Sequence, residues 1–186
     1  MSKPWKLLFA AAIVLAPISV ARAEQLIGVT LDQRIVTFDS ASPTLIGSSA
    51  LISGLAAGDV LGGIDMRSSN GVIYGIAANS GRIYSLTTAG IATFVSASSV
   101  VPTSGILGVD FNPVPDRLRV IGGDDQNLRI NVDNGAATVD TAISRADGGA
   151  IDVIGSAYTG GFAGGQCEQV DVIGHTGLRN DADRPA

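Results

Sequence analysis

Short runs of hydrophobic residues alternate with polar turn residues from about residue 26 to residue 159. The runs are rich in Val, Ile, Leu, Tyr and Phe, and they are separated by Gly, Asn, Asp and Ser. This pattern is typical of β-strands that are joined by tight turns. No stretch beyond the N-terminal segment keeps the period of an amphipathic helix. The pattern therefore predicts an all-β protein.

The predicted strands recur at an interval of 45 residues. Residues 61–66 (Leu-Gly-Gly-Ile-Asp-Met) return as residues 106–111 (Ile-Leu-Gly-Val-Asp-Phe), and a weaker copy, 26–29, precedes 74–77 by 48 residues. A repeat of roughly 40–50 residues built from short strands is typical of a β-propeller blade. We therefore predict a β-propeller-like fold of four-stranded blades, with about three blades present and the third incomplete.

An open array of three blades has a physical consequence. Propellers usually close with about four to eight blades, and closure protects the strand edges. Three blades leave unpaired edges at both ends of the array, and unpaired edges attract other strands. We expect self-association through these open blade edges.

Residues 1–23 have the features of an export signal. Lys3 and Lys6 provide the positively charged start, an apolar stretch follows, and residues 21–23 (Ala-Arg-Ala) supply a small-x-small cleavage site. The apolar stretch is shorter than the roughly 20 residues that a membrane-spanning helix needs. We predict cleavage before Glu24 and export to the periplasm or the exterior, with no membrane-spanning segment in the mature chain. An uncleaved membrane anchor is the alternative.

Removal of the signal leaves nine of the twelve basic residues, because three lie in the signal, against all seventeen acidic ones. The mature chain is therefore acidic, and it contains no lysine. Nucleic acids and anionic membrane surfaces bind clustered positive charge, so neither is an expected partner. The single cysteine, Cys167, excludes an internal disulfide, and the fold must rest on its hydrophobic core.

The residues that common catalytic sites require are missing from the predicted strands. The only histidine, His175, lies in the C-terminal segment 160–186, which excludes a Ser-His-Asp arrangement from the repeats. No Gly-x-Ser-x-Gly or Gly-Lys-Ser/Thr sequence is present. Zinc sites built from several Cys and His residues are excluded by their number. We predict no catalytic and no cofactor-binding residues.

Two aspartates recur at one position of the repeat, each at the end of a predicted strand. Asp65 and Asp110 are 45 residues apart, and Asn112 follows the second. Oxygen ligands of this kind suit a hard cation such as calcium, so these three residues are the metal candidates. We favour a structural role, in which each carboxylate accepts backbone N–H groups or pairs with an arginine such as Arg117 or Arg119.

Two further groups have structural interpretations. Residues 124–127 (Asp-Asp-Gln-Asn) depart from the spacing of a calcium-binding loop, and we expect a solvated turn. Tyr74, Tyr84, Phe94 and Phe111 lie within apolar strand runs. We expect these aromatic side chains to pack in the core rather than to form a platform for sugars.

Several segments together resemble the DUF4394 domain, an exported bacterial family. They are 31–39, 62–67, 110–113 (Asp-Phe-Asn-Pro), 116–120 (Asp-Arg-Leu-Arg-Val), 126–131 (Gln-Asn-Leu-Arg-Ile-Asn) and 133–135 (Asp-Asn-Gly). The resemblance covers about residues 26–159. It implies a β-propeller-like domain of uncharacterised function, with no reaction, substrate or catalytic residue to carry over.

The C-terminal segment departs from this resemblance. Residues 153–159 still resemble the family, whose members continue into further blades, but here the glycine-rich and polar segment 160–186 follows instead. We expect that segment to be disordered. We interpret the chain as a truncated member, with a genuine short form as the alternative. The predicted organisation is a signal at 1–23, an incomplete domain at 24–159 and a tail at 160–186.

The leading functional hypothesis is a non-enzymatic domain that serves binding or scaffolding at the cell envelope. It is motivated by the blade repeat and by the missing catalytic groups. One alternative is a calcium-dependent propeller hydrolase of the lactonase type, with Asp65, Asp110 and Asn112 as ligands. The other alternative is a truncated product with no function of its own.

Overall fold

The computed structural model describes residues 23–144, 153–158 and 170–174, and these residues form thirteen β-strands. The prediction of an all-β protein is confirmed. The described part of the chain contains no helix that is long and apolar enough to cross a membrane. The predicted signal peptide lies outside the described residues, apart from Ala23.

Antiparallel pairing groups the strands into four sheets. The first contains β1 (Gln25–Val29), β2 (Arg34–Asp39) and β3 (Ile46–Leu51). The second contains β4 (Leu61–Arg67), β5 (Val72–Ala77), β6 (Arg82–Leu86) and β7 (Ala92–Ala97). The third contains β8 (Leu107–Asn112), β9 (Arg117–Gly122), β10 (Asn127–Ile130) and β11 (Ala137–Val139). The fourth pairs β12 (Val153–Tyr158) with β13 (Val170–Gly174).

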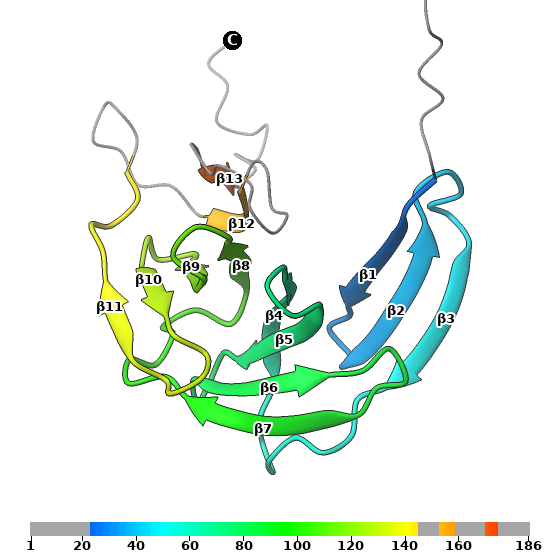
Figure 1. The fold of residues 1–186 in the computed structure, drawn as a ribbon, viewed down its shortest axis with the longest axis horizontal. Helices are drawn as coiled ribbons and strands as arrows, with labels where there is room; N and C mark the ends of the chain where they lie inside the picture. The colour runs from blue at the N-terminus through cyan, green and yellow to red at the C-terminus, as the bar shows by residue number, and fades with distance from the viewer. Residues whose placement is uncertain (1–22, 145–152, 159–169, 175–186) are drawn as a thin grey trace, which may run out of the picture.

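The sheets stand next to one another in an open arc (Figure 1). Strands β4, β8 and β12 are neighbours on the inside of the arc, and β7 and β11 lie at its periphery. Each sheet therefore stands like a propeller blade, with its strands stepping outward in chain order. The described sheets do not close into a ring, which confirms the predicted open, blade-like architecture.

The incomplete blade is not the one that the sequence indicated. The third sheet has four strands, like the second, whereas the first sheet has only three. Within residues 160–186, which we expected to be disordered, the structure describes strand β13 paired with β12. This strand is a short apolar run in polar sequence, so the repeat gave no indication of it. The rest of that segment lies outside the described residues.

Tight turns occur where the sequence places glycine. Gly71 connects β4 to β5 and Gly81 connects β5 to β6, each with a φ of 69°. This left-handed conformation disfavours residues with a Cβ atom, which explains why glycine recurs at the turns. Gln33 adopts the same region, with a φ of 56°, in the turn between β1 and β2.

Two hydrophobic clusters join neighbouring sheets. Successive residues of a strand face opposite sides of its sheet, so β5 contributes to both clusters. Ile73 packs with Ile35 between the first and second sheets, and Ile76 packs with Leu118 between the second and third. Ile35, Ile76 and Leu118 are fully buried at these boundaries.

Three of the four aromatic residues pack in these clusters, as predicted. Tyr74, Tyr84 and Phe111 are buried, and Tyr74 meets Phe111 edge-on across the boundary between two sheets. The prediction for Phe94 was wrong, because its side chain is 55% exposed. Phe94 belongs to β7, the outermost strand of its blade, and it covers only the edge of Tyr84.

Candidate functional site

The inner strands bring together the two aspartates of the repeat. Asp65 lies in β4 and Asp110 lies in the neighbouring strand β8. Their carboxyl groups share a hydrogen bond. Each side chain points from the inner edge of its sheet toward the next blade.

Each of these carboxylates also binds a backbone amide of the following blade. The Asp65 Oδ2 atom accepts a hydrogen bond from the N–H of Phe111 at 2.8 Å. The Asp110 Oδ2 atom accepts one from the N–H of Tyr158 in β12. The aspartate at this position of the repeat therefore makes the same hydrogen bond in both cases, from the carboxylate of one inner strand to an amide of the next.

Arginine does not take part in these contacts. Arg117 donates to the backbone carbonyls of Pro115 and Asp116. Arg119 donates to Asp140, Asn127 and the Tyr158 hydroxyl. Of the two suggested kinds of partner, the backbone N–H group is therefore the one observed; Arg119 stands opposite Asp110 in the β8–β9 ladder, but other acceptors bind its guanidinium.

The environment of the two carboxyl groups favours their neutral forms. Burial, and after it the nearby charge of Asp65, raises the pKa of Asp110 to about 7. Burial also raises the pKa of Asp65, although the hydrogen bond from the Phe111 amide opposes that shift. Two adjacent carboxylates repel each other when both are ionised, so the pair holds a proton over a pH range in which exposed aspartates are charged.

The third metal candidate lies apart from this pair. The Asn112 Oδ1 atom accepts a hydrogen bond from the N–H of Val114 at 3.0 Å and so fixes the turn between β8 and β9. No group of three or more His, Cys, Asp or Glu side chains gathers at one point in the described residues. The structure therefore brings together Asp65 and Asp110 but not Asn112.

The acidic run 124–127 forms a turn that is held by neighbouring residues. Asp124 accepts a hydrogen bond from the Thr103 hydroxyl, and Gln126 accepts one from the Thr103 amide at 3.1 Å. The side chain of Asn127 bridges Arg119 and the carbonyl of Thr141. These contacts make the run a structural turn.

Glycines in the inner strands allow the blades to approach closely. A Cβ atom on Gly63 would lie 2.5 Å from the side chain of Val109, and one on Gly108 would lie 2.8 Å from the backbone of Gly155. Gly63 and Gly108 are 45 residues apart, like the aspartates two residues later. The repeated Gly-x-Asp sequence therefore combines close backbone approach with a hydrogen bond to the next strand.

An ion-pair network joins the same two blades on another face. Arg67, at the end of β4, is buried and reaches into the third sheet. Its guanidinium binds Asp116 at 2.6 Å and Asp133 at 2.7 Å, each through two hydrogen bonds. These bonds from Arg67 hold the pKa values of both carboxyl groups below their usual range. The repeat comparison did not indicate this network, because no arginine stands at the equivalent position 112.

A second polar cluster lies inside the second blade. The Tyr84 hydroxyl donates to the Asp59 carboxylate at 2.5 Å, and Arg82 donates to the same carboxylate at 3.0 Å. The amide of Ala56 donates to the Tyr84 oxygen at 3.1 Å. Every partner in this chain of contacts is satisfied, and the cluster anchors the loop that leads into β4.

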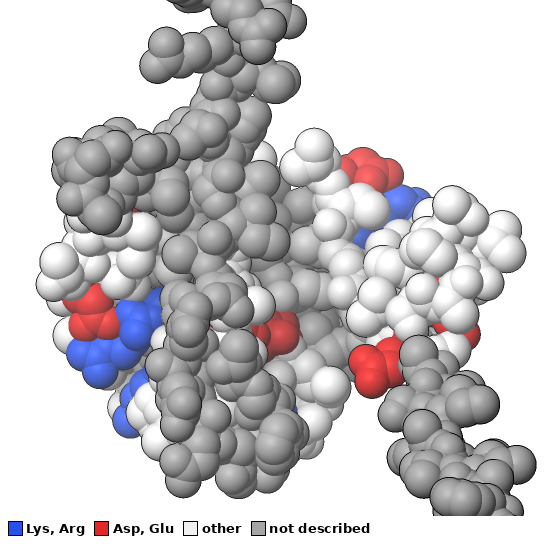
Figure 2. Space-filling model, turned by 90° about the horizontal axis from the view of Figure 1, so that it is seen from above, with Lys and Arg blue, Asp and Glu red and all other residues white. Residues whose placement is uncertain are grey.

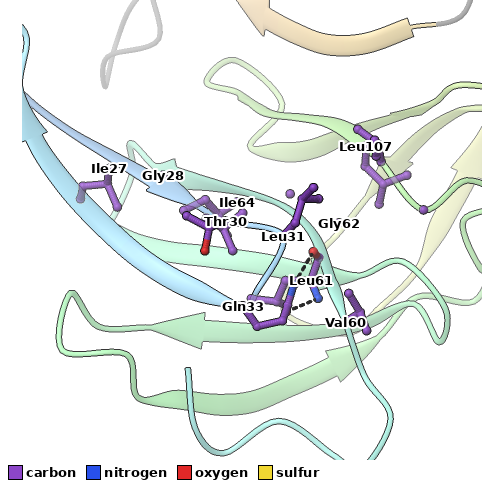
Figure 3. A pocket seen from close by; sticks show the side chains of 14 residues that line it. Ile27, Gly28, Thr30, Leu31, Gln33, Val60, Leu61, Gly62, Ile64 and Leu107 are labelled. Atoms are coloured by element: carbon purple, nitrogen blue, oxygen red, sulfur yellow. Dashed lines mark hydrogen bonds between the residues drawn. The ribbon is translucent and has the colours of Figure 1, made fainter. Parts of the chain in front are cut away.

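A groove runs between the first blade and β4 (Figure 3). Its main cavity has a volume of about 370 Å³ and is lined largely by apolar side chains and backbone. Ile27, Leu31 and Val29 form one wall, and Leu61 and Ile64 form the other. A second cavity of about 230 Å³ continues along β1 toward Gln25 and reaches Asp65 and Met66; Ile27 and Ile64 line both cavities.

Gln33 closes one end of the groove. Its Oε1 atom accepts a hydrogen bond from the N–H of Leu61 at 2.8 Å, and its Nε2 atom donates to the Leu61 carbonyl at 3.3 Å (Figure 3). The side-chain amide thus satisfies both backbone groups of Leu61, as a neighbouring strand would. The remaining length of the groove offers backbone and apolar surface.

Asp65 is the charged residue that lines these two cavities, and other charged side chains lie outside them. Figure 2 shows blue and red residues next to one another among uncharged ones. Asp140, for example, is bound by both Arg119 and Arg129. Some of the surface charges are thus paired with a residue of opposite sign, and the groove is the feature that most resembles a binding site.

The sequence did not indicate the groove. Its lining comes from three blades, because Leu107 of β8 joins β1 and β4, and none of its residues belongs to a motif with a known chemistry. The one available signal was the weak first copy of the repeat, which lacks the Gly-x-Asp segment found in the second and third copies.

Comparison with known proteins identifies one family. The family described as Domain of unknown function (DUF4394) matches residues 34–171. No curated protein matches the sequence.

Proposed function

Because the chain belongs to the DUF4394 family of domains of unknown function, we propose that it is a non-enzymatic binding or scaffolding domain, exported to the cell envelope. One observation carries this proposal: the inner-strand carboxylates accept backbone N–H groups of the next blade. Acids held in this way stabilise the fold and are not free to attack or protonate a substrate.

The other interior charges support the same conclusion. Arg67 is bound by two carboxylates, and Asp59 is bound by Tyr84 and Arg82. Catalytic acids and bases need access to a substrate, whereas these groups are saturated by protein partners. The groove between β1 and β4 is apolar and rich in backbone, which suits binding rather than bond cleavage.

Turnover measurements test the proposal directly. The purified chain is assayed against panels of hydrolase and oxidoreductase substrates, including lactones. We expect no turnover above that of a heat-unfolded sample. Turnover that disappears in an Asp65→Ala or Asp110→Ala variant that keeps the wild-type circular dichroism spectrum would overturn the proposal.

The calcium-dependent hydrolase remains a second candidate because Asp65 and Asp110 are in contact. A divalent cation between them would replace the proton that the pair retains. Calorimetric titration with calcium at pH 8, with Asp110→Asn as the control, distinguishes the two proposals. A binding domain without a metal site gives no heat and no rise in melting temperature. Heat that the variant lacks would favour the hydrolase.

A further inference from the structure

Among the described residues, the first blade lacks an inner strand. In the second blade, β5 precedes a turn in which the Gly81 amide binds the Ala77 carbonyl at 2.9 Å. In the first blade, β1 precedes a turn that is one residue shorter, closed by a bond of 2.9 Å from the Gln33 amide to the Thr30 carbonyl. This difference places Thr30 at the position of Ala77 and Gly28 at the position of Gly75. Strand β1 is therefore the counterpart of β5, which is the second strand of its blade. The offset between these two strands is 47 residues, whereas the sequence comparison suggested 48.

The missing strand leaves one edge of β1 without a partner among the described residues. Thr30 directs its backbone groups toward β2, and the ladder alternates, so Gly28 and Leu26 also face β2. The N–H and C=O groups of Gln25, Ile27 and Val29 therefore point to the opposite edge. In the second blade the corresponding edge of β5 is covered by β4.

The groove lies along this edge. Its two cavities share Ile27 and extend over the whole of β1, with β4 as the opposite wall. The groove thus has the length and direction of a strand, unpaired backbone groups on one side and apolar side chains around it. This combination is what β-strand addition requires.

Strand β4 shows where the missing strand would make its polar contact. Phe111 and Tyr158 donate their amides to the aspartate of the preceding inner strand. Met66 is the counterpart of Phe111 in the repeat, and its amide lies in the groove beside its own Asp65. No preceding inner strand exists within the described residues to provide its aspartate.

We propose that the groove binds an extended strand of a partner polypeptide with the Gly-x-Asp pattern of the inner strands. The strand runs antiparallel to β1, with its aspartate opposite Ile27 and accepting the Met66 amide, as Asp65 stands opposite Tyr74 in the second blade. This inference rests on the proposed binding function and specifies its ligand.

A second copy of the described fold does not supply such a strand. Strands β4 and β8 are already paired with β5 and β9 in their own blades. In β12 the position of the aspartate is Ala157, because Tyr158 takes the role of Phe111. The described residues thus hold no unpaired strand with the pattern that the groove matches, and we assign that strand to another polypeptide.

A peptide provides the direct test. A fluorescein-labelled peptide with the sequence of residues 106–112 is titrated with the purified full chain, and anisotropy is recorded. We expect saturable binding. Replacing the peptide aspartate with alanine removes a charged acceptor, and we expect affinity to fall about tenfold.

Backbone methylation of the peptide tests the strand geometry. In β8 the amide of Asp110 faces β9, while the amide of Phe111 faces the neighbouring blade. An N-methyl group on the peptide aspartate amide should abolish binding, because that amide would face β1. The same group on the peptide phenylalanine amide should leave binding within about twofold. Equal effects of the two methyl groups would overturn the proposal.

Variants of the chain complete the test. Met66→Pro removes the amide at an edge where it takes no part in the β4–β5 ladder, and Met66→Leu is the matched control. We expect the proline variant to lose peptide binding and the leucine variant to keep it, with melting curves confirming that both fold. Absence of saturable binding to the wild type would overturn the proposal. So would a dimer, seen by light scattering, that Met66→Pro dissociates, because a second copy would then occupy the groove. Neither result depends on the turnover assays.

Discussion

The carboxylate of Asp65 accepts the backbone N–H of Phe111 at 2.8 Å, across the boundary between two blades. Asp110 and Tyr158 repeat the relationship at the next boundary. A side chain therefore performs between blades the task that backbone groups perform within a sheet. The hydrogen bond fixes how far one inner strand is shifted along the next. Its loss should weaken the contact between the two blades.

Replacing Asp65 with alanine should destabilise the chain. The Phe111 amide would lose its acceptor in a partly buried setting, and we expect the free energy of unfolding to fall by about 1–3 kcal/mol. Asp65→Asn keeps an acceptor oxygen and should lose less. Urea unfolding followed by circular dichroism measures both variants. Equal losses for alanine and asparagine would show that the hydrogen bond does not stabilise the junction.

The stability of the chain should depend on pH through Asp110. Burial, and then the charge of Asp65, raises the pKa of this carboxyl to about 7 from its usual 3.8. Between these values the unfolded chain has released the proton that the folded chain retains, so a rise in pH favours unfolding. Stability contributed by Asp110 is complete below pH 3.8 and is lost as the pH rises through about 7.

The Asp110→Asn variant tests this effect, because asparagine does not ionise and Asp65 is then the one carboxyl group left of the pair. Melting temperatures are measured from about pH 4 to about pH 8 for both proteins. We expect the wild type to lose stability relative to the variant across this range. A constant difference between the two melting temperatures would contradict the raised pKa.

Removing Arg67 should cost more than removing a surface arginine. Arg67 is buried between Asp116 and Asp133, and its loss leaves the partly buried Asp116 without its cation. We expect Arg67→Ala to lower the free energy of unfolding by about 3 kcal/mol, at the low end for buried pairs because Asp133 is largely exposed. Arg129→Ala, which breaks an exposed pair with Asp140, is the control and should change stability little. Denaturant titrations measure both variants. If Arg67→Ala and Arg129→Ala lose the same free energy of unfolding, the buried ion pairs of Arg67 do not stabilise the contact between the blades.

Two turn glycines separate backbone strain from contact between blades. Gly71 and Gly135 have φ values of 69° and 75°. A Cβ atom on Gly71 meets open space, but one on Gly135 would lie 1.8 Å from the carbonyl oxygen of Ala97. We expect Gly71→Ala to cost about 1 kcal/mol from backbone strain alone. The same change at Gly135 should cost about 2–4 kcal/mol, because it also forces two blades apart. Thermal unfolding of the two variants, each compared with the wild type, measures the difference.

Much of the architecture was predictable from the sequence. Alternating apolar residues and turn glycines such as Gly71 and Gly81 define strands and hairpins through contacts between near neighbours in the chain. The 45-residue interval between Asp65 and Asp110 then indicated equivalent blades. The burial of Tyr74 and Phe111 followed from the same pattern. These features depend on local conformational preference and on strand alternation, and short stretches of sequence determine both.

The candidate site was predictable only in part. The repeat identified Asp65 and Asp110 and suggested backbone N–H groups or arginines as partners; the structure shows that the partners are amides of the next blade. Asn112, although close to Asp110 in the sequence, turns away to bind Val114. Side-chain type and spacing do not show which backbone amide of another blade will face a carboxylate.

By itself, the sequence determined a series of short antiparallel strands arranged as repeated blades, since those elements form from interactions within about 45 residues. Only the tertiary structure decided how the blades meet. A turn shorter by one residue identified β1 as a second strand, and the packing of the first three blades left the groove beside it. The groove and the uncovered edge of β1 arise where segments distant in the sequence pack together. Their physical cause is the geometry of that packing, which the composition of each segment alone does not determine.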